Sequence, residues 1–132
     1  MISDQDIARV SRIETYRDLI AWQKAMDLVE VVYEATDGFP KAEVYGLVSQ
    51  MRRSAVSIPS NLAEGFGRNS DGSFLQFCRI SQGSLREIET QIILSGRLGY
   101  MDSKAINGLL GRANEIGKIL YGLMRSIERR KS

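Results

Sequence analysis

The chain has 132 residues, of which 43% are hydrophobic and 26% charged, and its formal net charge is +2. These values are typical of one soluble domain with a single core. They exclude a transmembrane helix, because no stretch approaches about 18 uninterrupted apolar residues. The first residues show no basic segment followed by an apolar one, so we expect no signal peptide. A single cysteine, Cys78, permits no internal disulfide, and we expect a cytoplasmic protein without membrane contact.

Residues 1–15 are polar with scattered isoleucine and valine, and we predict a loosely ordered tail there. Residues 16–132 are predicted to form a single domain. Its first helix is expected from about Asp18 to Thr36, because apolar residues recur there at spacings of three and four. The predicted apolar face consists of Leu19, Trp22, Met26, Val29 and Tyr33. Gly38 and Pro40 are typical of a helix end and predict its termination.

A second helix is predicted from near Glu43, and it sorts into two faces at about 100° per residue. The apolar face consists of Val44, Leu47, Val48, Met51, Ala55, Ile58, Leu62 and Phe66. The opposite face, called here the polar stripe, consists of Gln50, Arg53, Ser57, Asn61, Glu64 and Arg68. The apolar pattern continues through Pro59, which predicts one helix kinked at this proline. Gly65 and Gly67 are expected to end it.

Two further helices follow. The third is predicted to begin after an N-cap at Ser70 or Asp71 and to end before Gly99. The residues that recur on it at spacings of three and four, called here the seam, are Phe74, Cys78, Ser81, Leu85, Ile88, Ile92 and Ser95. The fourth, capped by Asp102 or Ser103, carries Ile106, Leu110, Ala113, Ile116, Leu120, Met124 and Ile127. No segment alternates with period two, so we predict no strand and an all-α, up-down-up-down antiparallel four-helix bundle.

Three glycines, Gly108, Gly111 and Gly122, fall on one face of the fourth helix. A glycine inside a helix costs about 1 kcal/mol relative to alanine. We therefore expect something to approach the backbone closely on this face. Either a neighbouring helix of the bundle or another subunit satisfies the pattern, and the first is favoured.

The chain contains no histidine. This excludes imidazole acid–base catalysis, Ser-His-Asp and Cys-His nucleophiles, and the usual zinc sites. Glu87 and Glu89 are two residues apart, hence on different helix faces, and cannot jointly hold magnesium. Cys78 lies on the apolar seam and is interpreted as a core residue. We predict no catalytic residue, no metal and no cofactor.

Two polar features remain on the second and third helices. Within the polar stripe, Glu64 and Arg68 form an i,i+4 pair, which favours a structural or subunit-contact role. On the third helix, three arginines project in nearly one direction, in a row about 27 Å long. These are Arg79, Arg86 and Arg97. Such a row can follow phosphates, and it can equally be a solvated face beside Glu87 and Glu89.

Charge is also unevenly distributed, because residues 1–43 hold nine acids and five bases, or −4, while residues 44–132 hold seven acids and thirteen bases, or +6. The basic C-terminal residues are Arg125, Arg129, Arg130 and Lys131. This asymmetry is consistent with a polyanionic partner. It is also what the negative end of a helix dipole favours, and the second interpretation is preferred for the tail alone.

Several motifs together resemble one family. They are Asp18-Leu-x-x-Trp22-Gln-Lys-Ala25, Phe39-Pro40, Gln50-x-Arg-Arg53, Ser57-Ile-Pro59-Ser-Asn61, Ala63-Glu64-Gly65 with Arg68, and Gly83-Ser-Leu85 followed by Glu87-x-Glu-Thr-Gln91. From about Tyr16 to Arg129 the chain resembles the bacterial rRNA-intervening-sequence proteins, a four-helix-bundle family encoded partly in insertions within 23S rRNA genes. That family is similar to the accessory variability proteins of diversity-generating retroelements.

The resemblance implies a non-enzymatic bundle that assembles into a homopentameric ring. For the retroelement proteins it implies binding of a reverse transcriptase and of RNA or DNA through basic surface. For the intervening-sequence proteins it implies no established biochemical activity. Our leading hypothesis is an oligomeric scaffold that binds structured RNA or other nucleic acid through arginines. The alternative is an adaptor that contacts only proteins, with the polar stripe as a subunit contact.

Overall fold

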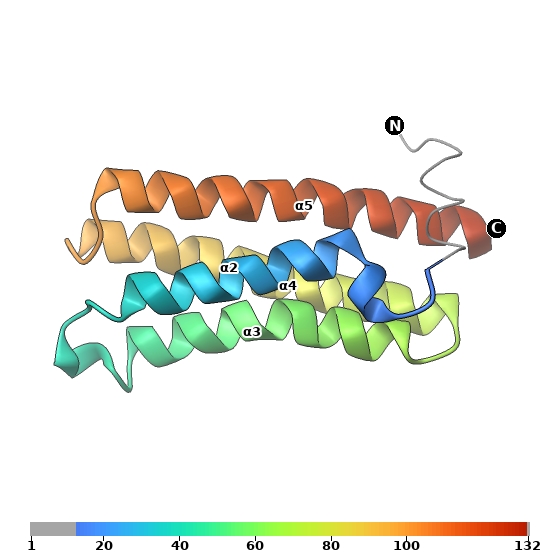
Figure 1. The fold of residues 1–132 in the computed structure, drawn as a ribbon, viewed down its shortest axis with the longest axis horizontal. Helices are drawn as coiled ribbons and strands as arrows, with labels where there is room; N and C mark the ends of the chain where they lie inside the picture. The colour runs from blue at the N-terminus through green and yellow to red at the C-terminus, as the bar shows by residue number, and fades with distance from the viewer. Residues whose placement is uncertain (1–12, 132) are drawn as a thin grey trace.

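The computed structural model describes residues 13–131, with Lys131 described in its backbone only. Four long helices pack as an up-down-up-down antiparallel bundle, which confirms the predicted fold class (Figure 1). They are α2 (Ile20–Thr36), α3 (Leu47–Phe66), α4 (Asp71–Arg97) and α5 (Ser103–Lys131), with short 3-10 helices η1 (Tyr16–Asp18) and η2 (Lys41–Glu43). The described part of the chain has no strand, and none of its helices is long and apolar enough to cross a membrane.

The core face of α2 differs from the predicted one. Its buried residues are Leu19, which directly precedes it, and Ala21, Ala25, Leu28, Val32 and Thr36. Met26 and Tyr33, predicted to face the core, are exposed, while Trp22 is only partly buried. The helix is thus rotated by about one residue, or 100°. Two of the buried positions, Ala21 and Ala25, are alanines, which the predicted face of larger side chains does not include.

The entry to α3 is also shorter than predicted. Residues near Glu43 form the separate 3-10 helix η2, and α3 begins at Leu47. Val44, assigned to the apolar face, is therefore exposed. The Glu43 side chain bonds the Leu47 backbone N–H through Oε1 at 3.2 Å, and the Tyr100 hydroxyl donates to Glu43 Oε2 at 2.8 Å. One carboxylate thus caps α3 and ties it to the α4–α5 turn.

The rest of α3 follows the predicted face from Leu47 to Leu62, and the helix runs through Pro59 without interruption. The kink at Pro59 remains a prediction. Gly67 is the C-cap, as expected, but Gly65 does not end the helix; it is buried inside the last turn against Phe77 of α4. The turn proper is made by residues 67–70, where Asn69 has a positive φ of 58°. The last-turn glycine is therefore a packing residue.

The seam predicted for α4 is confirmed, since all seven of its residues are buried. Ser70 is the N-cap and its Oγ accepts from the Ser73 N–H at 3.1 Å. Gly99 follows the helix with φ 79°, as expected at a helix end. At the start of α5, Asp102 Oδ1 accepts from the Ala105 N–H at 2.8 Å, which identifies Asp102 as the cap.

The predicted approach of a bundle helix to the α5 glycines is wrong for Gly108 and Gly111. Both are exposed, and a Cβ added to either would meet no atom within 4 Å. Another subunit remains as the alternative on this face. Of the predicted N-terminal tail, residues 1–12 lie outside the described residues, while Ile13 packs against the core and Thr15 caps η1.

Candidate nucleic-acid interface

A shallow groove of about 330 Å³ lies between α4 and α5 and is called here the α4–α5 groove. It is lined by Gln82 and Arg86 of α4 and by Asn114, Gly117, Lys118 and Tyr121 of α5. The α4 residues are four positions apart, and Asn114, Lys118 and Tyr121 are spaced by four and three. Each set therefore lies on one face of its helix. No carboxylate is among the lining residues.

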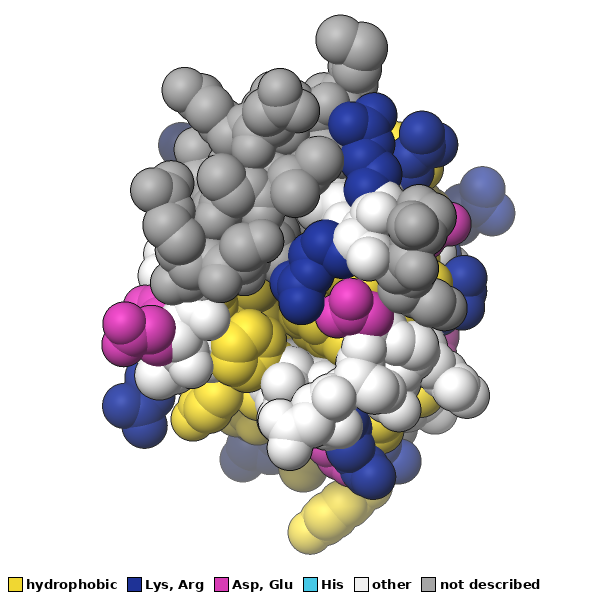
Figure 2. All heavy atoms as spheres, turned by 90° about the vertical axis from the view of Figure 1, so that its right-hand side faces the viewer, with side chains coloured by type: hydrophobic (Ala, Val, Ile, Leu, Met, Phe, Trp, Pro, Cys, Tyr) yellow, Lys and Arg dark blue, Asp and Glu magenta, His cyan; other side chains and the backbone are white. Residues whose placement is uncertain are grey.

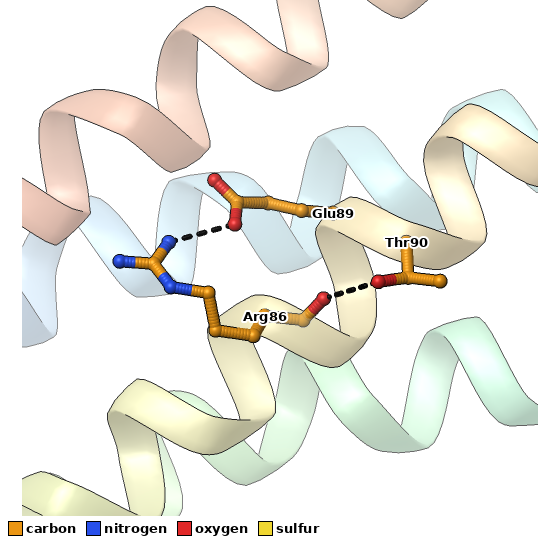
Figure 3. Close-up of polar contacts among 3 residues, drawn as sticks. All are labelled: Arg86, Glu89 and Thr90. Carbon is orange, nitrogen blue, oxygen red and sulfur yellow. Dashed lines mark hydrogen bonds and ion pairs between the residues drawn. The ribbon is translucent and has the colours of Figure 1, made fainter.

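Hydrogen bonds fix the position of Arg86, one of the two cations in this groove. Its Nη1 donates to Glu89 Oε1 at 2.7 Å, and its backbone carbonyl accepts from the Thr90 hydroxyl at 2.9 Å. Figure 3 shows the Arg86 and Glu89 side chains projecting from the same side of α4, with the guanidinium beside the Glu89 carboxylate. Arg86 Nη2 lies 4.0 Å from the position of a Cβ on Gly117 and has no bonding partner among the described residues. Glu89 thus orients the Arg86 guanidinium, and Arg86 Nη2 lies on the side of α5.

The predicted arginine row is exposed along α4, but only Arg86 lines the groove. Arg79 and Arg97 lie two turns before and three turns after it on the same helix face. Arg125, from the predicted basic C-terminal set, comes one turn after Tyr121. Its Nη1 donates to the Tyr121 hydroxyl at 3.4 Å. Arg125 therefore contacts a residue of the groove lining without itself lining the groove.

The remaining C-terminal cations lie at the end of the bundle that Figure 2 shows. There, Arg130 Nη2 is 3.1 Å from Asp71 Oδ1, an ion pair that joins the end of α5 to the start of α4. Figure 2 shows Lys and Arg side chains at several places on this end, with acidic side chains between some of them. Arg129 is exposed, and the Lys131 side chain lies outside the described residues.

The polar stripe of α3 divides into two parts. Ser57 and Asn61 turn toward α4: Ser57 Oγ is 2.8 Å from Ser84 Oγ, and Asn61 Nδ2 donates to Ser57 Oγ at 2.9 Å. Glu64 and Arg68 are exposed and paired at 2.7 Å. The other two stripe residues, Gln50 and Arg53, are also exposed. The stripe is therefore partly a contact within the bundle, and only its outer part is available to a partner.

Sequence reasoning missed most of the groove, namely Gln82, Asn114, Gly117, Lys118 and Tyr121. A signal was present in α5, where Lys118, Tyr121 and Arg125 recur at spacings of three and four. These spacings place two cations and an aromatic ring on one face.

Two observations on the described residues concern thiol and metal chemistry. Burial raises the pKa of the Cys78 thiol to about 12, so the thiol is protonated at neutral pH. No group of three acidic or cysteine side chains among residues 13–131 is placed to hold a metal ion. What this surface offers is cations, amides and one aromatic ring.

The comparisons with known proteins place this fold in a family. A crystal structure from Bacteroides thetaiotaomicron, described as a protein with unknown function from the S23 ribosomal protein family, superimposes with a TM-score of 0.72. It is 19% identical, and the match covers 80% of this chain and 98% of that one, so it shows the shared fold. No curated protein matches the chain. The family model for the 23S rRNA-intervening sequence protein matches residues 17–122, and the chain belongs to that family.

Proposed function

We propose that this protein is a non-enzymatic, homo-oligomeric scaffold that binds structured RNA through the α4–α5 groove. The observation that carries the proposal is the lining of the groove, which combines two cations, two amides and an exposed tyrosine without a carboxylate. Cations bind phosphate oxygens, while amides and aromatic rings contact bases. The family name refers to an intervening sequence of 23S rRNA, and RNA is therefore the first nucleic acid to test.

The non-enzymatic part of the proposal is supported by chemistry. The chain has no histidine, and its only cysteine, Cys78, is buried and protonated at neutral pH. Neither the usual general acid–base group nor a thiolate nucleophile is therefore offered at the surface. A scaffold that binds RNA requires neither of them and no cofactor.

The oligomeric part is supported by the face that α3 and α4 form together, called here the α3–α4 face. Ile80 and Leu94 of α4 and its C-cap Leu98 are exposed. Ile80 lies one turn before Ser84, which contacts Ser57 of α3. Two turns after Ser84 on α4, Gln91 Oε1 is buried without a hydrogen-bond partner among the described residues. Exposed apolar side chains beside an unpaired buried acceptor are expected of a subunit contact. The resemblance suggests five subunits.

The experiment is a salt titration of RNA binding. Fluorescence anisotropy with a labelled hairpin RNA is expected to show affinity falling steeply with salt, since each neutralised phosphate contributes about −0.9 to the log–log slope on a duplex. The double variant Arg86→Gln/Lys118→Gln is expected to bind more weakly and to lower that slope by about one for each cation removed. Arg112→Gln is the matched control, because Arg112 is exposed on α5 but does not line the groove.

Two results would contradict the proposal. One is the absence of measurable binding to RNA or DNA at about 50 mM salt, where phosphate contacts are strongest. The other is binding that the groove variants and Arg112→Gln reduce equally, because it would then depend on net charge alone.

The alternative function, a protein-binding adaptor such as a partner of a reverse transcriptase, is favoured by a second groove. This groove, of about 590 Å³, lies between α2 and α3 and includes Tyr33, Val44 and Arg52 in its lining. Tyr45 at its edge is 97% exposed. A fully exposed aromatic beside apolar residues is typical of protein contacts. Under this alternative the purified protein binds no RNA in the salt titration.

A further inference from the structure

We propose that the α4–α5 groove binds an unpaired nucleotide, whose base stacks on Tyr121 while Arg86 and Lys118 bind the adjoining phosphates. The inference rests on the proposed function and specifies which part of a structured RNA the protein recognises. It predicts selectivity for loops, bulges and ends over continuous duplex.

The floor of the groove is Gly117. A Cβ at this position would lie 3.5 Å from Leu85 Cδ2, an ordinary packing distance, so the bundle itself does not require a glycine here. Glycine inside a helix costs about 1 kcal/mol relative to alanine. Its effect is to lower the floor of the groove to the α5 backbone beside Arg86. A flat group lying on Tyr121 would occupy this space.

The ring of Tyr121 is suited to stacking. It is 56% exposed, and no other aromatic ring contacts it among the described residues. Its hydroxyl accepts from Arg125, whose guanidinium carbon is 5.9 Å from the ring centroid. This contact holds the ring from the next turn of α5. A ring that Arg125 holds from one side and that is more than half exposed can stack a base on its remaining free face.

The polar groups beside the ring suit a nucleotide better than an isolated anion. Arg86 and Lys118 come from opposite walls and can contact successive phosphates of one strand. Gln82 and Asn114 each offer both donors and acceptors, which the edge of a base requires and a simple anion does not. The volume of about 330 Å³ is at the small end of the range of about 300–1,000 Å³ for ligand pockets.

The base has to be unpaired for a physical reason. In a continuous duplex both faces of each base are covered by neighbouring bases, and only the edges are exposed in the grooves. Proteins that stack bases on aromatic side chains therefore bind loops, bulges and single strands. A duplex can still contact Arg86 and Lys118 through phosphates, but it cannot use Tyr121.

The test compares two RNA probes, a hairpin with an open loop and a blunt duplex of the same stem. Wild-type protein is expected to bind the hairpin more tightly. Tyr121→Leu should weaken hairpin binding by about 5- to 150-fold, the range that base–aromatic stacking carries, and leave duplex binding unchanged. Tyr121→Phe keeps the ring and should retain the preference for the hairpin. Tyr45→Leu, at an exposed tyrosine outside the groove, is the control.

A second variant tests the floor without touching the ring. Gly117→Leu should fill the groove, keep α5 helical and abolish the preference for the hairpin. Far-UV circular dichroism and unfolding curves check that each variant is folded. If Tyr121→Leu and Gly117→Leu both keep the wild-type preference while Arg86→Gln/Lys118→Gln weakens binding, the stacking inference is overturned and the proposed function stands. If the charge variants are also silent, both fail.

Discussion

Replacing Gly65 by alanine tests how closely α3 and α4 pack. Gly65 is buried in the last turn of α3. A Cβ added there would lie 2.5 Å from Phe77 Cβ and 3.2 Å from Phe74 Cδ1. The first contact is decisive, because Phe77 Cβ is bonded directly to the α4 backbone and cannot rotate away. The two helices would have to separate at this end of the bundle.

The expected magnitude follows from two opposing terms. Overpacking a core costs about 1–3 kcal/mol, and a clash with a backbone-anchored atom belongs at the upper end. Removing a helix glycine returns about 1 kcal/mol. The net expectation for Gly65→Ala is a loss of about 2 kcal/mol in the free energy of unfolding. Gly83→Ala is the matched control, because Gly83 is exposed within α4 and has nothing within 4 Å of its added Cβ. There only the gain of about 0.5–1 kcal/mol remains.

The measurement is urea unfolding of the wild type and both variants, followed by far-UV circular dichroism at one protein concentration. A fixed concentration is needed because assembly would add a concentration-dependent term to stability. The expected order of stability is Gly83→Ala, wild type, Gly65→Ala. A Gly65→Ala protein as stable as the wild type would refute the reasoning, since it would mean that α3 and α4 are not held at this spacing.

Two further predictions concern the bundle end and the subunit contact. The Tyr100 hydroxyl bond, followed by the Leu47 N–H bond, lowers the pKa of the Glu43 carboxyl from its ordinary 4.5. The contact therefore stabilises the fold above pH 4.5, and the stabilisation is lost as pH falls through the lower folded pKa. The melting temperatures of wild type and Tyr100→Phe should differ at neutral pH and converge in acid. A difference in melting temperature that does not depend on pH would contradict this. Glu64→Ala should weaken assembly, measured by sedimentation. The free energy of association should fall by about 3–5 kcal/mol if the change leaves Arg68 buried and unpaired between subunits. It should fall by less than about 1 kcal/mol if the pair is exposed in the oligomer. A fully assembled Glu64→Ala protein with stronger RNA binding would instead assign this face to RNA.

The helices of the bundle were predictable from the sequence because their signals are local. Apolar spacing of three and four, together with Ser70, Asp102 and Gly99 at the helix ends, depends on residues within one turn of each other. The core face of α2 was predicted wrongly because the prediction followed the largest apolar side chains, whereas the buried face includes small ones. Ala21 and Ala25 contribute little apolar area each, yet both are buried, while the larger Met26 is exposed.

Only the α4 wall of the candidate site was partly predictable from the sequence. The arginine row follows from spacing along α4, which is local information. The groove also requires the rotation and register of α5 against α4, which depend on packing between residues about 30 positions apart, such as Gly117 against Leu85. Spacing within α5 does not reveal that Tyr121 and Lys118 lie opposite Gln82 and Arg86. Sequence reasoning could therefore name Arg86, but neither Lys118 nor the aromatic ring of Tyr121.

The two proposed surfaces require different sides of α4, and this allows assembly and RNA binding to coexist. Ile80 lies one turn before Ser84, which contacts α3, whereas Gln82 and Arg86 line the groove toward α5. Subunits that associate through the α3–α4 face would leave every α4–α5 groove open. Each oligomer would then present several equivalent grooves, and an RNA that reaches two of them would bind more tightly than one groove allows, without any new contact. A variant that abolishes assembly but spares the groove should therefore lose affinity for long RNA and keep its affinity for a single short hairpin.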